Sequence, residues 1–221
     1  MHYLGLALYA EGPTDYYFLR PLLQRLCEDI CVRESPHSVE FSEVLALDHS
    51  DRLKDAPRER RILEAARAAR SAWRILFVHT DGANDPARAR EQLVQPALAL
   101  LQQEMAQEGC GVAVIPIRET ETWAIWDGDA LRQVFGTTLS DQALGLAVSA
   151  NLVESMADPK AALNHAFQAT QPSGRRKKQG VSPMLNALGE QVSLDCLRQM
   201  AGFSLFEAEL KQALHQLQIL Q

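Results

Sequence analysis

The chain has 221 residues, with 22 basic and 28 acidic side chains and a formal net charge of −6 at pH 7. This length is sufficient to bury one substantial hydrophobic core. The acidic balance argues against a uniformly basic nucleic-acid-binding surface, although it leaves room for a local basic patch. No apolar run approaches the roughly 20 residues that span a bilayer, and the first residues do not resemble a secretory signal, so we expect a cytoplasmic protein. Four cysteines at irregular spacing argue against a disulfide framework or a zinc site.

Strand and helix patterns alternate along the first half of the chain. Apolar runs predict four strands, at residues 3–10, 39–47, 74–81 and 111–117. Helical periodicity between them predicts helices that follow the Gly-Pro turn up to Ile30 and that cover residues 58–70 and 86–108. Strands joined by helices pair in parallel through right-handed crossovers. The pattern therefore predicts an α/β fold, with a parallel-rich sheet of about four strands and helices on both faces.

Short helical patterns dominate after Glu119. They predict helices at residues 119–126, 129–135, 159–170, 183–188, 194–200 and 203–217. The stretch QPSGRRKKQG, residues 171–180, has four bases and no acid, and we expect an exposed loop there. The second half is thus predicted to be a helical part that follows the α/β sheet.

Acidic residues follow three of the four predicted strands. Glu11 follows the first strand, Asp81 ends the third with Asp85 four residues on, and Glu119 and Glu121 follow the fourth. Ligands of open parallel sheets gather at the carboxyl ends of the strands, so we expect these carboxylates to lie together. Their mutual repulsion is relieved most directly by a hard cation such as Mg²⁺ or Mn²⁺. The sequence therefore predicts a divalent metal site.

The same residues also have structural interpretations. Asp85 precedes a proline and is well placed to cap the next helix. Glu11 and Asp81 are each followed by glycine, which favours close approach of a ligand or of backbone over capping. Glu119 and Glu121 chelate together if the segment is extended and splay if a helix has begun. His79 shares a strand face with Asp81, and its pattern fits a metal ligand, an acid or a packed histidine equally.

The basic stretch has two interpretations as well. Arg175, Arg176, Lys177 and Lys178 are either a solvated charge run or a clamp for phosphate groups. The nucleotide-binding and hydrolase motifs GxGxxG, GxxxxGK[ST] and GxSxG do not occur in the sequence, so dinucleotide binding, P-loop hydrolysis and the α/β-hydrolase elbow have no motif support.

The order of these motifs resembles the Toprim fold of topoisomerases, primases and overcoming-lysogenization-defect nucleases. More specifically, it resembles the bacterial Toprim-like domain-of-unknown-function family 4276. The matching segments span most of the chain; they are AEGPTDYYFLRPLL, FVHTDGAND, PIRETETWAIWD, DPKAALNHA and the aromatic-led helix of GFSLFEAEL. The resemblance implies a Toprim-like α/β domain at residues 1–128 and a helical extension packed on it at residues 129–221.

The resemblance also implies roles for the acidic residues. Glu11 would be the catalytic acid or base, while Asp81 and Glu121 would hold Mg²⁺ or Mn²⁺ with Glu119 and Asp85 as auxiliaries. The second aspartate of the family's DxD pattern is displaced here to Asp85, because positions 79 and 83 are His and Ala.

The function implied is that of a metal-dependent endonuclease that hydrolyses phosphodiester bonds. Lys160, Arg175, Arg176, Lys177 and Lys178 would neutralise phosphates of the nucleic acid. By resemblance, we expect an effector of antiphage defence that works with an ABC-type or AAA ATPase. Two alternatives stay open: an inactive Toprim-like module that docks on the ATPase, and an enzyme acting on a small phosphate ester. The choice between DNA and RNA and the formation of a homo-oligomer also stay open.

Overall fold

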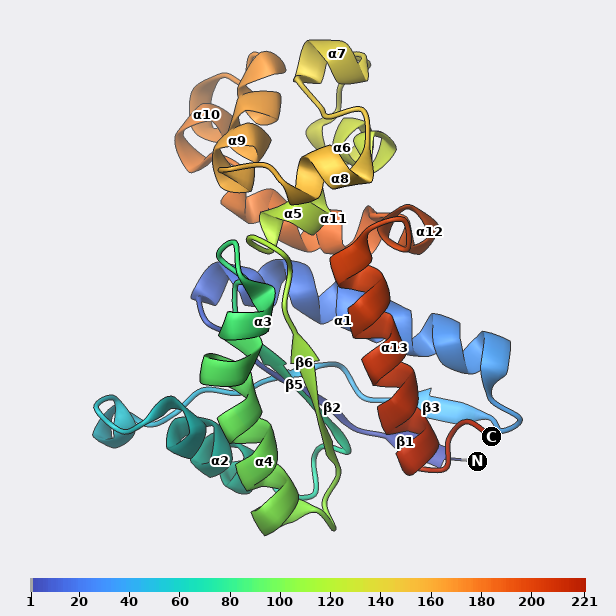
Figure 1. The fold of residues 1–221 in the computed structure, drawn as a ribbon. Helices are drawn as coiled ribbons and strands as arrows, with labels where there is room; N and C mark the ends of the chain where they lie inside the picture. Colours follow the sequence, from blue (N-terminus) through green and yellow to red (C-terminus); the bar gives the residue numbers. More distant parts are fainter. Residues whose placement is uncertain (1) are drawn as a thin grey trace.

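Four parallel strands form the central sheet, in the spatial order β4-β2-β5-β6; Figure 1 labels three of them, β2, β5 and β6. The computed structural model describes residues 2–221. The strands of this sheet are β2 (Leu6–Tyr9), β4 (Leu45–Ala46), β5 (Ile75–His79) and β6 (Cys110–Val114). A second, two-stranded parallel sheet pairs β1 (His2–Leu4) with β3 (Val39–Phe41). The predicted α/β class with a parallel sheet of about four strands is confirmed.

Two predicted strands are each divided in two, so the expectation of unbroken strands is wrong there. Gly5 separates β1 from β2, and residues 42–44 separate β3 from β4. A Cβ atom on Gly5 would lie 2.4 Å from the carbonyl oxygen of Ala72, so the close approach of another segment shapes the chain at this point. Ser42 bridges the break, because the Leu6 N–H donates to its hydroxyl and its own N–H donates to the Leu4 carbonyl.

Helices cover both faces of the sheet, as predicted. α1 (Pro13–Glu34) and α13 (Ala201–Gln216) pack on the face that carries Leu8, Phe77 and Val112. α2 (Arg58–Ala68) and α4 (Gln95–Met105) pack on the face that carries Ala7, Leu76 and Ala113. Successive strand residues point to opposite faces, which explains why a strand such as β5 is apolar throughout. The helix predicted over residues 86–108 is interrupted, with α3 (Pro86–Ala89) followed by a π-helical turn (Arg90–Val94) before α4.

A lobe of short helices lies beyond the carboxyl ends of the strands (Figure 1). The remaining helices are α5 (Glu121–Ile125), α6 (Gly128–Phe135), α7 (Asp141–Leu144), α8 (Ala150–Glu154), α9 (Pro159–Ala169), α10 (Gly174–Gln179), α11 (Leu185–Gln191) and α12 (Leu194–Leu197), with 3-10 turns at Asp51–Leu53 and Ser182–Met184. Among residues 2–221, no helix is both long and apolar enough to cross a membrane.

The basic stretch at residues 171–180 was predicted as a loop, but it contains the helix α10. Arg176 explains the difference, because its guanidinium lies 5.3 Å from the centre of the Phe167 ring and also donates to the Phe135 carbonyl. This tertiary contact holds the segment against α9 and α6, and the composition of the stretch alone does not reveal it. Arg175, Lys177 and Lys178 remain exposed.

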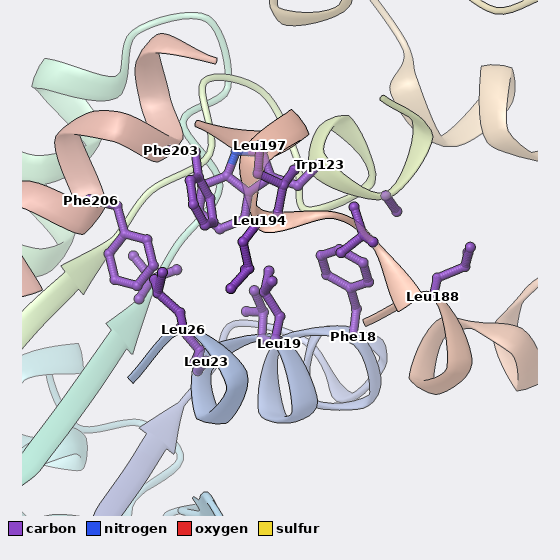
Figure 2. Packing of buried hydrophobic residues seen from close by; sticks show 14 of the residues in the cluster. Phe18, Leu19, Leu23, Leu26, Trp123, Leu188, Leu194, Leu197, Phe203 and Phe206 are labelled. Carbon is purple, nitrogen blue, oxygen red and sulfur yellow. The ribbon is translucent and has the colours of Figure 1, made fainter. Parts of the chain in front are cut away.

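One hydrophobic cluster joins the lobe to the sheet. The Trp123 ring of α5 lies 5.2 Å from the ring of Phe203 and 5.9 Å from that of Phe206, both on α13. Phe206 in turn lies 6.1 Å from Phe77 of β5. Figure 2 shows Trp123, Phe203 and Phe206 above Leu19 and the other apolar side chains of α1, with residues of α11 and α12 beside them.

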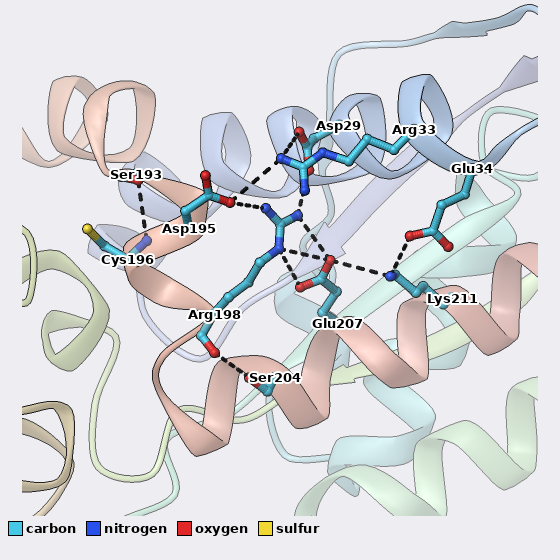
Figure 3. Close-up of polar contacts among 10 residues, drawn as sticks. All are labelled: Asp29, Arg33, Glu34, Ser193, Asp195, Cys196, Arg198, Ser204, Glu207 and Lys211. Carbon is cyan, nitrogen blue, oxygen red and sulfur yellow. Dashed lines mark hydrogen bonds and ion pairs between the residues drawn. The ribbon is translucent and has the colours of Figure 1, made fainter.

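An ion network ties the last helices to α1 (Figure 3). Arg198 follows α12, and its guanidinium donates to Asp195 at 2.8 Å, to Glu207 at 2.9 Å and to Asp29 on α1. Hydrogen bonding to Glu207 is the main reason why the pKa of Arg198 is raised. Lys211 also pairs with Glu34 near the end of α1. α13 is thereby held against α1 by charge as well as by apolar packing.

Candidate active site

The order of the strands reverses between β2 and β5. From β2 the chain passes through α1 to β4 at one edge of the sheet, and then through α2 to β5 on the other side of β2. Ligands of open parallel sheets bind in the crevice at the carboxyl ends of strands that flank such a point. Glu11 follows β2 and Asp81 follows β5, so two predicted site residues lie at this crevice.

A cleft of about 400 Å³ occupies the crevice. Its lining contains three of the predicted acids, Glu11, Asp81 and Glu119. The other lining residues are Thr80, Ala83, Asn84, Leu93, Arg118 and Ala157. The structure therefore brings together carboxylates that follow three neighbouring strands.

A second cavity, of about 440 Å³, lies between β6, α3 and α13. Its lining is mostly apolar, and its charged residues Arg90 and Glu209 pair with each other at 2.7 Å. This cavity is slightly larger than the cleft lined by Glu11, Asp81 and Glu119, which we call the carboxylate cleft. The titratable groups that can carry chemistry nevertheless gather in the carboxylate cleft.

Glu11 is anchored to the loop that follows β5. Its Oε2 accepts hydrogen bonds from the Thr80 hydroxyl at 2.7 Å and from the Asp81 N–H at 3.2 Å. Both bonds use the same oxygen, which leaves Oε1 available to a ligand. Arg58 lies nearby and donates to the His79 carbonyl at 2.6 Å. Burial lowers the pKa of Arg58, and the charge of Glu11 partly offsets this effect.

Asp81 and Glu119 each have a buried oxygen without a hydrogen-bond partner among residues 2–221. These atoms are Asp81 Oδ1 and Glu119 Oε2. The pKa of Glu119 is raised, first by burial and then by the charges of Asp81 and Asp158. A buried carboxylate oxygen with no donor is costly, and either a proton or a cation relieves the cost.

Beyond the end of the sheet, the backbone segment after β5 stays hydrogen-bonded to the backbone segment after β6. The N–H of Gly82 donates to the Pro116 carbonyl at 3.0 Å, and that of Ala83 donates to the Arg118 carbonyl at 3.1 Å. A Cβ atom on Gly82 would lie 2.3 Å from the Pro116 oxygen, so only glycine fits this approach. The approach positions Asp81 next to the segment that carries Glu119.

His79 is packed behind the cleft. It is completely buried, and its Nε2 lies 3.1 Å from the Thr120 hydroxyl and 3.6 Å from Asp81 Oδ1. Thr120 donates to Asp15, which also accepts the Gly12 N–H at 2.9 Å. This chain of contacts joins the end of β5 to the start of α1 and to the segment before α5. His79 is therefore packed, but its second ring nitrogen, Nδ1, is buried without a hydrogen-bond partner within residues 2–221.

Glu121 and Asp85 lie outside the cleft lining. Glu121 is the first residue of α5, so its side chain diverges from that of Glu119, and it lines a small separate pocket with Asp15 and Thr120. Burial is the main reason why the pKa of Glu121 is raised. Asp85 caps α3 by accepting the Arg88 N–H at 2.9 Å, which is the structural alternative considered for it.

The predicted basic residues divide into two groups. Lys160, the second residue of α9, lies beside the acids, and its charge lowers the pKa of both Glu119 and Glu121. The basic residues of α10 lie in the outer part of the lobe, away from the carboxyl ends of the strands (Figure 1). Of the predicted basic set, Lys160 is therefore the residue that the structure places at the carboxylates.

Asp81 and Glu119 are the residues of the cleft that could hold a cation. Among residues 2–221, no three or more His, Cys, Asp and Glu side chains form a group arranged to hold a metal ion. Mg²⁺ is usually bound through one or two carboxylates and several water molecules. The unpartnered oxygens of Asp81 and Glu119 are hard donors of this kind.

Arg118 and Asn84 line the cleft but were not singled out in the sequence. Their signal was their position, since each lies within three residues of a predicted site acid on a segment that follows a strand.

Comparison of the chain with protein-family models, with curated proteins and with solved structures gives no significant match. Function is therefore inferred from the geometry and chemistry of the cleft.

Proposed function

We propose that the protein is a Mg²⁺- or Mn²⁺-dependent nuclease of Toprim type that hydrolyses phosphodiester bonds. The observation that carries this proposal is the convergence of Glu11, Asp81 and Glu119 on one cleft, together with the two unpartnered carboxylate oxygens. In this proposal Glu119 takes the role that the sequence motif assigned to Glu121, because Glu119 and not Glu121 lines the cleft.

Each residue of the cleft has a separate role in the proposed reaction. Asp81 and Glu119 would hold the cation, which when bound neutralises charge on the phosphoryl group and acidifies water. Glu11 is fixed through one oxygen by Thr80 and the Asp81 N–H, so its other oxygen is oriented to accept a proton from water and to return it to the leaving oxygen. Lys160 supplies positive charge beside the carboxylates.

We further propose a cytoplasmic effector of antiphage defence that works with an ABC-type or AAA ATPase. The sequence motifs support this assignment, and the net charge of −6 supports the need for a partner that supplies positive surface to a nucleic acid. The exposed residues Arg175, Lys177 and Lys178 would contact nucleic acid phosphates away from the cleft.

The second candidate is an inactive module that docks on the ATPase. Asp85 favours it, because the displaced second aspartate of the DxD pattern caps a helix and does not line the cleft. Metal binding separates the two candidates, because only the nuclease needs the cation.

Calorimetry with Mg²⁺ and Mn²⁺ tests the metal site. Asp81→Asn removes the charge of one proposed ligand, so we expect it to weaken binding at least about tenfold, or roughly 1.4 kcal/mol. Asp55→Asn, which changes an exposed aspartate outside the cleft, is the control and should bind as wild type does. Equal affinity of Asp81→Asn and wild type would contradict the site.

Cleavage of plasmid DNA and of tRNA tests the reaction. Glu11→Gln keeps the size and the hydrogen-bond acceptor but cannot transfer the proton, so we expect loss of cleavage with almost no change in melting temperature. Glu40→Gln, at an exposed position in β3, should cut as wild type does. If Glu11→Gln retains wild-type cleavage, the proposed reaction is wrong and the docking module is favoured.

A further inference from the structure

Arg118 lies at the junction of two pockets. It lines the carboxylate cleft and also a neighbouring pocket of about 320 Å³, and Asn84 lines both as well. The rest of the neighbouring pocket is formed by Ile117, Asn151, Glu154 and Ser155. A ligand that enters the cleft can therefore extend into a second compartment past the same arginine.

The guanidinium of Arg118 is unpaired. No carboxylate of residues 2–221 forms an ion pair with it, although Glu119 is its neighbour in the chain and Glu154 lines the same pocket. Both oxygens of Glu154 are already used, since they accept the N–H groups of Ala201 and Gly202 at the start of α13. The positive end of that helix offsets the charge of Glu154. The charge of Arg118 is therefore available to an anion.

The uncharged polar side chains around Arg118 include two amides and a hydroxyl, beside the acids Glu11, Asp81, Glu119 and Glu154 that line the same two pockets. Asn84 and Asn151 are exposed and present primary amides, each of which can donate hydrogen bonds to an oxygen of a ligand. Asn84 has a φ of 83°, a strained conformation for a residue other than glycine, and the preceding N–H is fixed to the Arg118 carbonyl. A forked guanidinium flanked by amide donors is suited to the oxygens of a phosphate.

We propose that Arg118, Asn84 and Asn151 form a subsite for a phosphate of an oligonucleotide, adjacent to the phosphate at the carboxylates. This inference rests on the proposed function for its substrate class and adds the subsite that orients the strand. An oligonucleotide is favoured over a lone phosphate, because the two pockets share Arg118 and Asn84 and so suit a chain with successive phosphates.

Fluorescence anisotropy with a short labelled thymidine oligonucleotide, in EDTA, tests the subsite without metal or cleavage. Arg118→Gln should weaken binding at least about fivefold and lower the salt slope by roughly 0.7, the value for one phosphate contact to a single strand. Arg74→Gln removes the same charge at the opposite end of β5, from an exposed position, and should leave affinity and slope unchanged. Equal affinity and slope for the two variants overturn the subsite.

Two further variants guard against a folding defect. Arg118→Lys keeps the charge and should bind the oligonucleotide more tightly than Arg118→Gln does. Asn84→Asp keeps the size of the side chain but places a carboxylate in the subsite, so it should bind more weakly than wild type. Both should melt cooperatively near the wild-type temperature. Wild-type affinity of Asn84→Asp overturns the subsite.

Inorganic phosphate serves as a competitor. Displacement of the oligonucleotide only at concentrations far above the oligonucleotide's own dissociation constant supports the assignment, and displacement at equal concentrations overturns it. Arg118-dependent binding without any metal-dependent cleavage leaves the subsite standing and contradicts the proposed nuclease. Metal-dependent cleavage together with binding that does not depend on Arg118 supports the nuclease and overturns the subsite. The failure of the subsite and the failure of the nuclease are therefore distinguishable.

Discussion

Glu119 and Glu121 carry negative charge where burial opposes it. Burial raises the pKa of both, and the charges of Asp81 and Asp158 raise that of Glu119 further. A carboxyl group with a raised pKa binds its proton more tightly in the folded chain than in the unfolded chain. Ionisation of these groups therefore lowers the stability of the fold, and such a cost is typical of residues retained for function.

Glu121→Gln should stabilise the metal-free protein at neutral pH. Below the ordinary pKa of 4.5 the carboxyl is protonated in both states and contributes no penalty. The penalty develops as the pH rises from that value through the raised pKa, so the variant should melt like wild type in acid and a few degrees higher at pH 7. Thermal unfolding across this range measures the difference, with exposed Glu40→Gln as the control. A lower melting temperature for Glu121→Gln at pH 7 would contradict the expected sign.

Local sequence patterns predicted the strand β5 and the start of the helix α3, but they did not predict the break at Gly5 or the helix α10. The apolar run of β5 and the proline at the start of α3 are local signals, and both elements lie where they were predicted. The break at Gly5 depends on contact with Ala72, and α10 depends on the contact of Arg176 with the Phe135 carbonyl. These contacts join residues that are distant in sequence, so periodicity could not reveal them.

The candidate site shows the same division. The rule for strand ends placed Glu11 and Asp81 together, and the structure brings them to one cleft. The choice between Glu119 and Glu121 depended on where α5 begins, and helix boundaries are the least certain part of a sequence-based prediction. Asp85 caps α3 and does not line the cleft. Helix capping is the structural role that its place before a proline predicts.

Gly82→Ala tests whether the two loops must approach each other closely. The new Cβ would lie 2.3 Å from the Pro116 oxygen and 2.5 Å from the Ile117 oxygen, so the loops must separate. We expect a loss of stability of about 1–3 kcal/mol, as for other overpacked sites, and weaker Mg²⁺ binding because Asp81 moves away from Glu119. Denaturant unfolding and calorimetry measure the two effects.

Gly136→Ala is the matched control for this prediction. Gly136 has a φ of 61° and no atom within 4 Å of an added Cβ, so the variant introduces backbone strain alone, outside the cleft. It should lose stability without losing metal affinity. Unchanged Mg²⁺ binding by Gly82→Ala would show that the loop contact does not position the carboxylates.

At the scale of the whole molecule, the α/β part and the helical part share one core. The cluster on the α1 face of the sheet runs from Leu4 to Leu220, and Phe206 of α13 contacts both Phe77 of β5 and Trp123 of α5. The main chain carbonyls of Gly189 and Val192 also accept hydrogen bonds from Arg25 on α1. The boundary predicted between residues 1–128 and 129–221 therefore crosses a continuous hydrophobic cluster.

A fragment of residues 1–128 should not fold by itself. Without α11 and α13 it exposes the apolar face of the sheet and of α1, including Phe18, Phe77 and Trp123, each of which is fully buried in the complete chain. Full burial of one such side chain is worth roughly 1.5–3 kcal/mol, and a domain of this size has a net stability of only about 5–15 kcal/mol. We expect the fragment to bind a hydrophobic dye, to lack near-ultraviolet circular dichroism and to unfold without a cooperative transition, and we expect residues 129–221 supplied in trans to restore part of each signal. A fragment that melts cooperatively with a native near-ultraviolet spectrum would show that the sheet and its first helices form an independent domain and that α13 is an accessory to it.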